Sequence, residues 1–187
     1  LICKLLRLIV KNSVDFPPHY LVQVAGELIS SGHQVSYTKN LNTEDYDLYI
    51  LSSSIVCHET EIENIINLVK RGRTIIVIGP FATSNPEPYI KAGAKVLKGE
   101  PEMFFHKFNK KLDFIKKLPN IIINSSTVPL DELSFPGWDV ISKEYVPKMK
   151  FIGNGPAINI YASRGCPYSC FYYCTYPIFH FFKLSSA

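Results

Sequence analysis

The sequence predicts an α/β fold, in which helices cover both faces of a five-stranded parallel sheet. Short apolar runs of strand length alternate with runs of helical character through residues 1–111. The first of these runs, residues 5–10, is continuously apolar, as a strand buried on both faces should be. Alternation of this kind is typical of parallel strands joined by helical crossovers.

Five segments are expected to form the sheet. The fourth, residues 74–78, is the most β-branched and should lie centrally, whereas residues 94–97 should form an edge strand. Five strands with their crossovers fit the Rossmann-like, flavodoxin-like order 2-1-3-4-5. In chain order, the expected strands are residues 5–10, 34–38, 48–52, 74–78 and 94–97.

Four segments have helical character. Pro17 and Pro18 mark the start of the first helix, and Gly32 ends it. A short helix is expected at residues 86–92 and a last helix at residues 102–111. The remaining helix, residues 59–70, should bury one apolar face made of Ile62, Ile65, Ile66 and Val69.

The regular pattern loosens after residue 111, which divides the chain into three expected parts. Residues 112–156 form an irregular linker, in which residues 121–124 have the character of a short strand. The linker should pack on another part of the protein, because Leu133, Phe135 and Trp138 need burial. Residues 157–187 begin a second domain, whose first strand spans residues 158–162. The first part, residues 1–111, is the α/β domain.

Composition excludes several function classes. The net charge is +4, and the basic residues are scattered, so nucleic acid is not an expected partner. No apolar run approaches the roughly 18–20 residues of a membrane span, and residues 1–10 lack the features of a signal peptide. We therefore expect a cytoplasmic protein. Because the chain starts at Leu1 and not at Met, its N-terminus is expected to be incomplete.

Three of the five cysteines, Cys166, Cys170 and Cys174, lie within nine residues of one another. An odd, clustered set favours metal or cluster ligation over a disulfide framework. On a regular helix Cys166 and Cys174 would be about 12 Å apart, so a shared cluster requires a wrapped loop. Three thiolates leave one iron of a four-iron cluster open to a substrate or cofactor. Zinc, with His180 as a fourth ligand, is the alternative.

The cysteine loop, SRGCPYSCFYYCTYP, resembles that of radical SAM proteins with a cobalamin-binding domain. Members of that family carry CxxxCxxC in a segment close to SRGCPYxCxYC. The match is in register through Cys170, but this chain has CxxxCxxxC, one residue more. A local bulge could absorb the extra residue, or the third thiolate could be drawn out of reach. The resemblance places Tyr173 beside the adenine of S-adenosylmethionine.

The same family resemblance extends upstream, so that it covers about residues 17–177. Family members have related short motifs in the same order, at the helix start, at the strand ends and in the linker. Phe81 and Pro101 replace residues that are common in the family. The matching segments are Pro17-Pro18, Gly32-His33-Gln34-Val35, Ser52-Ser53-Ser54, Gly79-Pro80-Phe81-Ala82-Thr83, Gly99-Glu100-Pro101-Glu102 and residues 130–139 (LDELSFPGWD).

This resemblance implies small-molecule cofactors: a 4Fe-4S cluster held by Cys166, Cys170 and Cys174, S-adenosylmethionine, and cobalamin. The reaction would be radical chemistry, including methyl transfer. The DxHxxG motif is absent, so cobalamin would bind without a protein histidine on cobalt. Cofactors bind at the carboxyl ends of strands in open α/β sheets. The implied cofactor-binding residues there are Ser52, Ser53, Gly79, Pro80, Gly99 and Glu100.

Other interpretations stay open. Gly79 and Gly99 also fit ordinary turns at strand ends. Only 13 residues follow Cys174, too few for the remaining units of a barrel, so the chain is expected to be incomplete as an enzyme. The alternative function is a non-catalytic cobalamin-type binding module, or a gene remnant, with an orphaned cysteine loop. A response-regulator-like domain is disfavoured because the acidic cluster after strand one is missing.

Overall fold

The computed structural model describes most of the first 142 residues and short stretches beyond them. The expected first strand, residues 5–10, lies outside the described residues, as do Cys166, Cys170, Tyr173 and Cys174. The described residues are 17–39, 41, 45–108, 112–142, 146, 157–161, 163–164 and 183–184.

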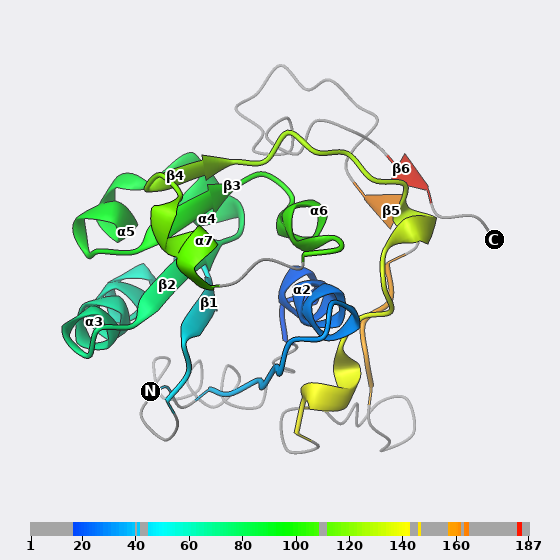
Figure 1. Cartoon of the computed structure of the whole chain (residues 1–187), viewed down its shortest axis with the longest axis horizontal. Coiled ribbons are helices and arrows are strands. Elements are labelled where there is room, and N and C mark those ends of the chain that lie inside the picture. Colours follow the sequence, from blue (N-terminus) through cyan, green and yellow to red (C-terminus); the bar gives the residue numbers. More distant parts are fainter. Residues whose placement is uncertain are drawn as a thin grey trace, which may run out of the picture.

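A parallel sheet with the order β1-β2-β3-β4 organises the described chain (Figure 1). Every pairing in it is parallel, with Ile50 opposite Ile76 and Val77 opposite Val96. Three of the five predicted sheet strands are confirmed, and so is the short strand expected at residues 121–124. The strand β2 is internal to the sheet, as its β-branched sequence predicts. The strands are β1 (Leu48–Ser52), β2 (Thr74–Ile78), β3 (Lys95–Lys98) and β4 (Ile121–Ile123).

The described sheet departs from the prediction in two places. Residues 34–38, predicted as a strand, form none, and residues 121–123 join the described sheet as its fourth strand. The predicted edge strand, β3, is internal, because Val96 pairs with Ile121 of β4 on its far side. The sheet therefore includes residues from the segment expected to be a linker.

Helices cover both faces of the sheet, as predicted (Figure 1). The helices α2, α6 and α7 pack on one face, and α3, α4 and α5 pack on the other. Of these, α4 and α7 were not predicted, and α6 is shorter than expected. The bounds are α2 (His19–Ser30), α3 (His58–Lys70), α4 (Pro80–Ser84), α5 (Glu87–Lys91), α6 (Pro101–Phe105) and α7 (Leu112–Lys117).

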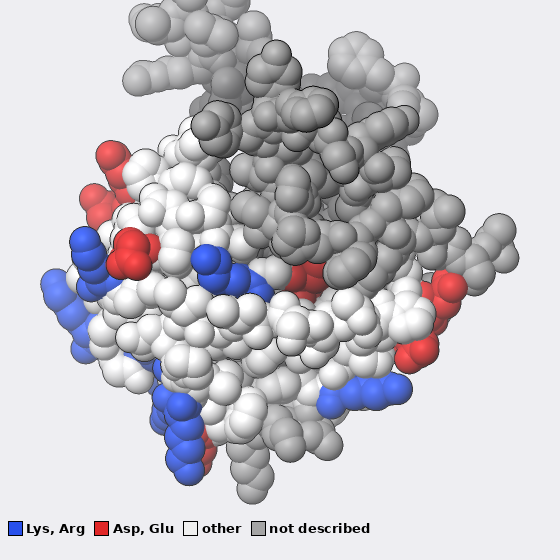
Figure 2. Space-filling model, turned by 90° about the horizontal axis from the view of Figure 1, so that it is seen from above, with Lys and Arg blue, Asp and Glu red and all other residues white. Residues whose placement is uncertain are grey.

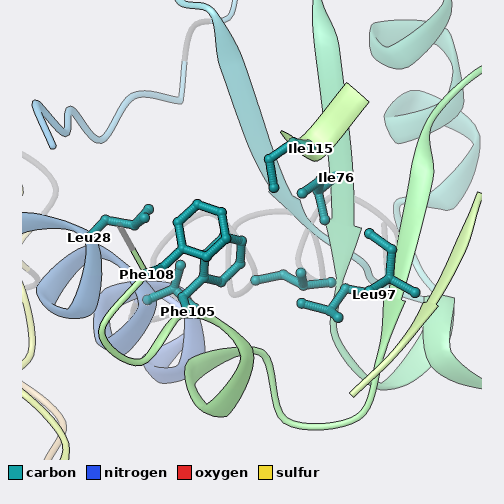
Figure 3. Packing of buried hydrophobic residues seen from close by; sticks show 9 residues of the cluster. Leu28, Ile76, Leu97, Phe105, Phe108 and Ile115 are labelled. Carbon is teal, nitrogen blue, oxygen red and sulfur yellow. The ribbon is translucent and has the colours of Figure 1, made fainter. Parts of the chain in front are cut away.

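The alternating side chains of β2 serve two cores. Ile76 and Ile78 point to the α2 side, and Ile75 and Val77 to the α3 side, as the period of a strand requires. Figure 3 shows the first core, in which the rings of Phe105 and Phe108 lie beside Leu28, with Ile76, Leu97 and Ile115 across the sheet face. Burial of this apolar surface is the main stabilising term for the sheet.

The end of α2 agrees with the sequence-based prediction, whereas the buried face of α3 does so only in part. Gly32 has φ of 85°, and the backbone N–H of His33 bonds to the carbonyl of Leu28, which closes α2 as predicted. In α3 the buried residues are Ile65 and Leu68. The expected face was wrong in part, because Ile66 and Val69 are 38% and 36% exposed.

The chain after β4 forms two short 3-10 helices, η1 (Leu130–Glu132) and η2 (Trp138–Val140). Leu133 and Trp138 are half-buried, but Phe135 is 95% exposed, so its expected burial is wrong. The predicted strand at residues 158–162 is not present in its described part. Instead, β5 (Ser163–Arg164) pairs antiparallel with β6 (Lys183–Leu184). The divisions at residues 111 and 156 stay predictions.

The surface and helix lengths bear on possible partners. Figure 2 shows Lys and Arg side chains at several places around one face, with Asp and Glu side chains among them. Across the described ranges, no helix combines the length and the apolar character that crossing a membrane requires.

Candidate functional site

The loops that follow β1, β2 and β3 meet at one edge of the sheet, because parallel strands end on the same side. The register places Ser52, the last residue of β1, opposite Ile78, the last residue of β2. The six described residues that the sequence implicates in cofactor binding therefore lie along this carboxyl edge. They are Ser52, Ser53, Gly79, Pro80, Gly99 and Glu100.

Ser53 connects the loops after β1 and β2. Its backbone N–H bonds to the carbonyl of Ile78 at 2.9 Å, and its hydroxyl oxygen accepts a 2.9 Å hydrogen bond from the backbone N–H of Ala82. The side chain is buried. The hydroxyl thus satisfies a donor in the first turn of α4, so that Ser53 has a role in the fold independent of any ligand.

Position 79 requires a glycine for two reasons. Its φ of +107° is strained for any residue with a Cβ atom, and an added Cβ would lie 2.8 Å from the Tyr20 hydroxyl. Tyr20 belongs to α2 and also has a side-chain hydrogen bond with Ser52. Burial raises the pKa of Tyr20 to about 12, so this hydroxyl keeps its proton at neutral pH. Tyr20 was not identified from the sequence, where its only signal is its place after Pro17-Pro18.

Gly99 has a similar position at the end of β3. Its φ is +99°, and an added Cβ would lie 3.1 Å from the carbonyl oxygen of Asn124. The Asn124 side chain donates a 2.9 Å hydrogen bond to the carbonyl of Glu100, and its backbone N–H donates to Lys98. Asn124, which was likewise not identified from the sequence, therefore fixes this loop against the end of β4.

Glu61 of α3 links the loop after β1 to α5. One carboxylate oxygen accepts a 2.9 Å hydrogen bond from the backbone N–H of Ser54, and the other accepts a 2.7 Å bond from the Tyr89 hydroxyl. Burial raises the pKa of Glu61, and the hydrogen bonds from Tyr89 and Ser54 lower it by less. Glu61 was not identified from the sequence, where it reads as an ordinary charge in an amphipathic helix.

Exposed apolar side chains lie next to these polar groups. Ile55 and Val56 follow Ser54 and are 69% and 85% exposed. Pro80, at the start of α4, is also exposed. The ring of His58 lies 5.5 Å from that of Phe81, and its Nδ1 lies 3.1 Å from the carbonyl oxygen of Ile55. The edge therefore offers an apolar surface and half-buried hydroxyls to a ligand.

Metal-binding geometry is a separate matter. Within the described ranges, no three His, Cys, Asp or Glu side chains are grouped so as to hold a metal ion. The predicted ligands Cys166, Cys170 and Cys174 lie outside those ranges, as does Tyr173. The metal site stays a prediction.

Comparison with known proteins gives a distant relative. No family model matches the chain. An uncharacterized methyltransferase of Synechocystis sp. is 29% identical over 174 residues, which are 89% of this chain and 30% of the relative. The chain thus spans about three tenths of that relative's length. Among solved structures, the N-terminal domain of a hypothetical protein from Thermotoga maritima matches with a TM-score of 0.43 and 19% identity, over 58% of this chain and 94% of that one.

Proposed function

We propose that this chain is the front part of a radical SAM methyltransferase with a Rossmann-like, cobalamin-type domain. The observation that carries the proposal is the placement of three strand-end loops along one carboxyl edge, where open α/β sheets bind cofactors. The similarity to a protein named as a methyltransferase supports methyl transfer as the reaction. That similarity extends over most of the chain, and so does not depend on a single motif.

The side chains at the edge fit a large cofactor that is bound by its faces and not by a side-chain ligand. Ile55, Val56 and Pro80 supply exposed apolar surface, and Ser52 is half-buried beside them. The glycines do not form an open cradle, because protein atoms already occupy the space beside Gly79 and Gly99. A corrin ring would therefore lie against the apolar loop residues, with the glycines shaping the turns below it.

The cysteine loop supplies the second part of the proposal. The thiolates of Cys166, Cys170 and Cys174 would hold three irons and leave the fourth open to S-adenosylmethionine. A bound 4Fe-4S cluster supplies an electron for the reductive cleavage of S-adenosylmethionine, and cobalamin carries a methyl group. Tyr173 would place an aromatic face beside the adenine.

The test is anaerobic reconstitution of the chain with iron and sulfide. We expect about four irons per chain in the wild type and marked loss in C166A, C170A and C174A. The matched control is C57A, because Cys57 is an exposed free cysteine outside the loop and should leave iron content unchanged. Equal iron in all four variants, or none in the wild type, contradicts the cluster assignment.

Cobalamin binding is tested separately, by co-elution of hydroxocobalamin with the chain on gel filtration. We expect wild-type binding and its loss in V56D, which places a charge on the exposed apolar surface of the edge. Cobalamin binding without iron binding would favour the alternative function, a non-catalytic binding module. Failure of both would remove both assignments.

A further inference from the structure

A fully buried carboxylate lies on α2, away from the residues described above. The Glu27 side chain is 0% exposed. Its Oε1 accepts a 2.6 Å hydrogen bond from the backbone N–H of Ser134, and its Oε2 lies 3.2 Å from the Ser134 hydroxyl. Nδ1 of His106, at the end of α6, lies 3.1 Å from the same Oε2. Glu27 thus joins α2 both to α6 and to the segment between η1 and η2.

Further contacts hold residues 134–137 against α2. The side-chain amide of Gln23 donates a 2.6 Å hydrogen bond to the carbonyl of Ser134, and the backbone N–H of Gly137 donates a 2.9 Å bond to the carbonyl of Val22. The approach is close enough that a Cβ on Gly26 would lie 2.0 Å from the carbonyl oxygen of Phe135. The two backbones meet only because glycines stand at this crossing.

A buried carboxylate is costly unless hydrogen bonds compensate for the water it loses. Two of the groups that compensate for Glu27 belong to Ser134. If residues 134–137 moved away, the carboxylate would lose these partners, and Gly26 would lose its packing against Phe135. The docked position is therefore strongly favoured over an undocked one.

The chain beyond this segment returns to the same helix. The ring of Tyr161 stacks on that of His19, in the first turn of α2, with centroids 4.2 Å apart. In Figure 1 the orange segment that leads to β5 runs on the same side of α2 as the yellow segment with η1 and η2. Next along α2 is Tyr20, whose hydroxyl reaches Ser52 at the carboxyl edge. The start of the cysteine loop follows at Ser163.

We propose that Glu27 is a positioning residue, whose carboxylate fixes residues 134–137 on α2 and thereby sets where residues 157–161 lie against the same helix. This positioning serves the cysteine loop, an assignment that rests on the proposed function. Glu27 touches no reacting group. It acts through the backbone of Ser134 and through α2, which both Ser134 and Tyr161 contact.

The test uses the full chain and its single tryptophan. Trp138 follows Gly137 and is half-buried, so its emission reports on the docked segment. E27A should shift this emission to the red and speed amide exchange in residues 134–137 by at least about tenfold, the factor that corresponds to about 1.4 kcal/mol. E27Q keeps one acceptor for the Ser134 N–H and should restore most of the protection. E63Q, at an exposed position in α3, is the matched control and should match the wild type.

A positioning role requires a second readout at a distance from Ser134. If Glu27 made only a local contact, its loss would leave that distant readout unchanged. Amide exchange in residues 157–161 should also rise in E27A, and the electron paramagnetic resonance signal of the reduced cluster should change. G137A, whose Cβ would lie 2.9 Å from that of Ala25, undocks the segment without altering Glu27 and should give the same two changes. It also serves if E27A fails to fold.

Three results would overturn the proposal. They are unchanged Trp138 emission in E27A, changed emission with no change in residues 157–161, and an E27Q variant no better than E27A. Failure of the proposed function has a different signature. In that case the wild type holds no iron, while the fluorescence and exchange measurements still report on Glu27 and residues 157–161.

Discussion

The Tyr89 hydroxyl donates a 2.7 Å hydrogen bond to Oε2 of Glu61, and this pair holds α5 against α3 beneath the carboxyl edge. Glu61 also accepts from the backbone N–H of Ser54, so the loop after β1 depends on the same carboxylate. A change in the charge of Glu61 therefore affects the loop that carries the exposed Ile55 and Val56.

The raised pKa of Glu61 has a consequence for stability. Burial, the largest cause, places the folded-state pKa above the ordinary 4.5. The folded chain then holds the proton more tightly than the unfolded chain, so the contribution of this group is greatest below the unfolded pKa and falls as pH rises through the folded one. The free energy of unfolding of the wild type, relative to E61Q, should decrease as pH rises from about 4 to 7. Urea denaturation at several pH values measures this difference between the wild type and E61Q. An increase of the difference with pH would contradict the prediction.

Removal of the Tyr89 hydroxyl should raise the pKa of Glu61 further, because the bond that favours the charged carboxylate is lost. Y89F should lower the free energy of unfolding at pH 7 by about 1–3 kcal/mol. The matched control is Y46F, since the buried Tyr46 hydroxyl has no hydrogen-bond partner among the described residues. Y46F should cost little or nothing, and an equal loss in both variants would show that the bond to Glu61 is not the cause.

Gly79 should tolerate alanine less well than Gly72 does. Both have positive φ, +107° and +74°, so both substitutions carry backbone strain of roughly 1–2 kcal/mol. Only at Gly79 would the new Cβ also meet Tyr20 and Ser53, whereas nothing lies within 4 Å at Gly72. G79A should therefore lose about 1–3 kcal/mol more than G72A. Thermal and urea unfolding measure the difference. Equal losses would mean that the Tyr20 side chain moves away from the new Cβ without lowering the free energy of unfolding.

Burial decides the cost of shortening isoleucines in the sheet. Ile76 is 0% exposed in the core on the α2 side, whereas Ile123, in β4, is 76% exposed. I76A should lower the free energy of unfolding by about 2–5 kcal/mol, and I123A by less than about 0.5 kcal/mol. A large loss in I123A would show that β4 is covered by a part of the protein outside the described residues.

Local patterns were sufficient where a segment is governed by its own side chains. The β-branched run of β2 and the Pro18 and Gly32 boundaries of α2 could be predicted because apolar burial and helix termination are local properties. The role of β4 could not, because Ile121 joins the sheet only through its pairing with Val96. The exposed position of Phe135 is a similar case. It follows from the close contact of two backbones at Gly26, which no periodicity in the sequence reveals.

The same limit applies to the candidate site. The strand-end serines and glycines were identified through the family resemblance, and they share one edge because parallel strands end on the same side of a sheet. Tyr20, Glu61 and Asn124 were not identified, since each reaches that edge from a different element. The contact of Tyr20 with Gly79 and that of Asn124 with Gly99 give both glycines a structural role, which the sequence left open beside the ligand-binding one.

The extra residue between Cys170 and Cys174 leads to a prediction about cluster retention. One residue of extended chain adds about 3.3–3.6 Å, a large displacement for a thiolate that must reach iron at a bond length. Deletion of Tyr172 restores the CxxxCxxC spacing and keeps Tyr173 next to Cys174. On the proposed function, the deletion variant should retain more iron than the wild type after reconstitution and dilution. The control is Y172A, which changes the side chain at unchanged length and should behave as the wild type. If the deletion lowers iron retention instead, the loop accommodates the extra residue in a bulge on which the cluster depends.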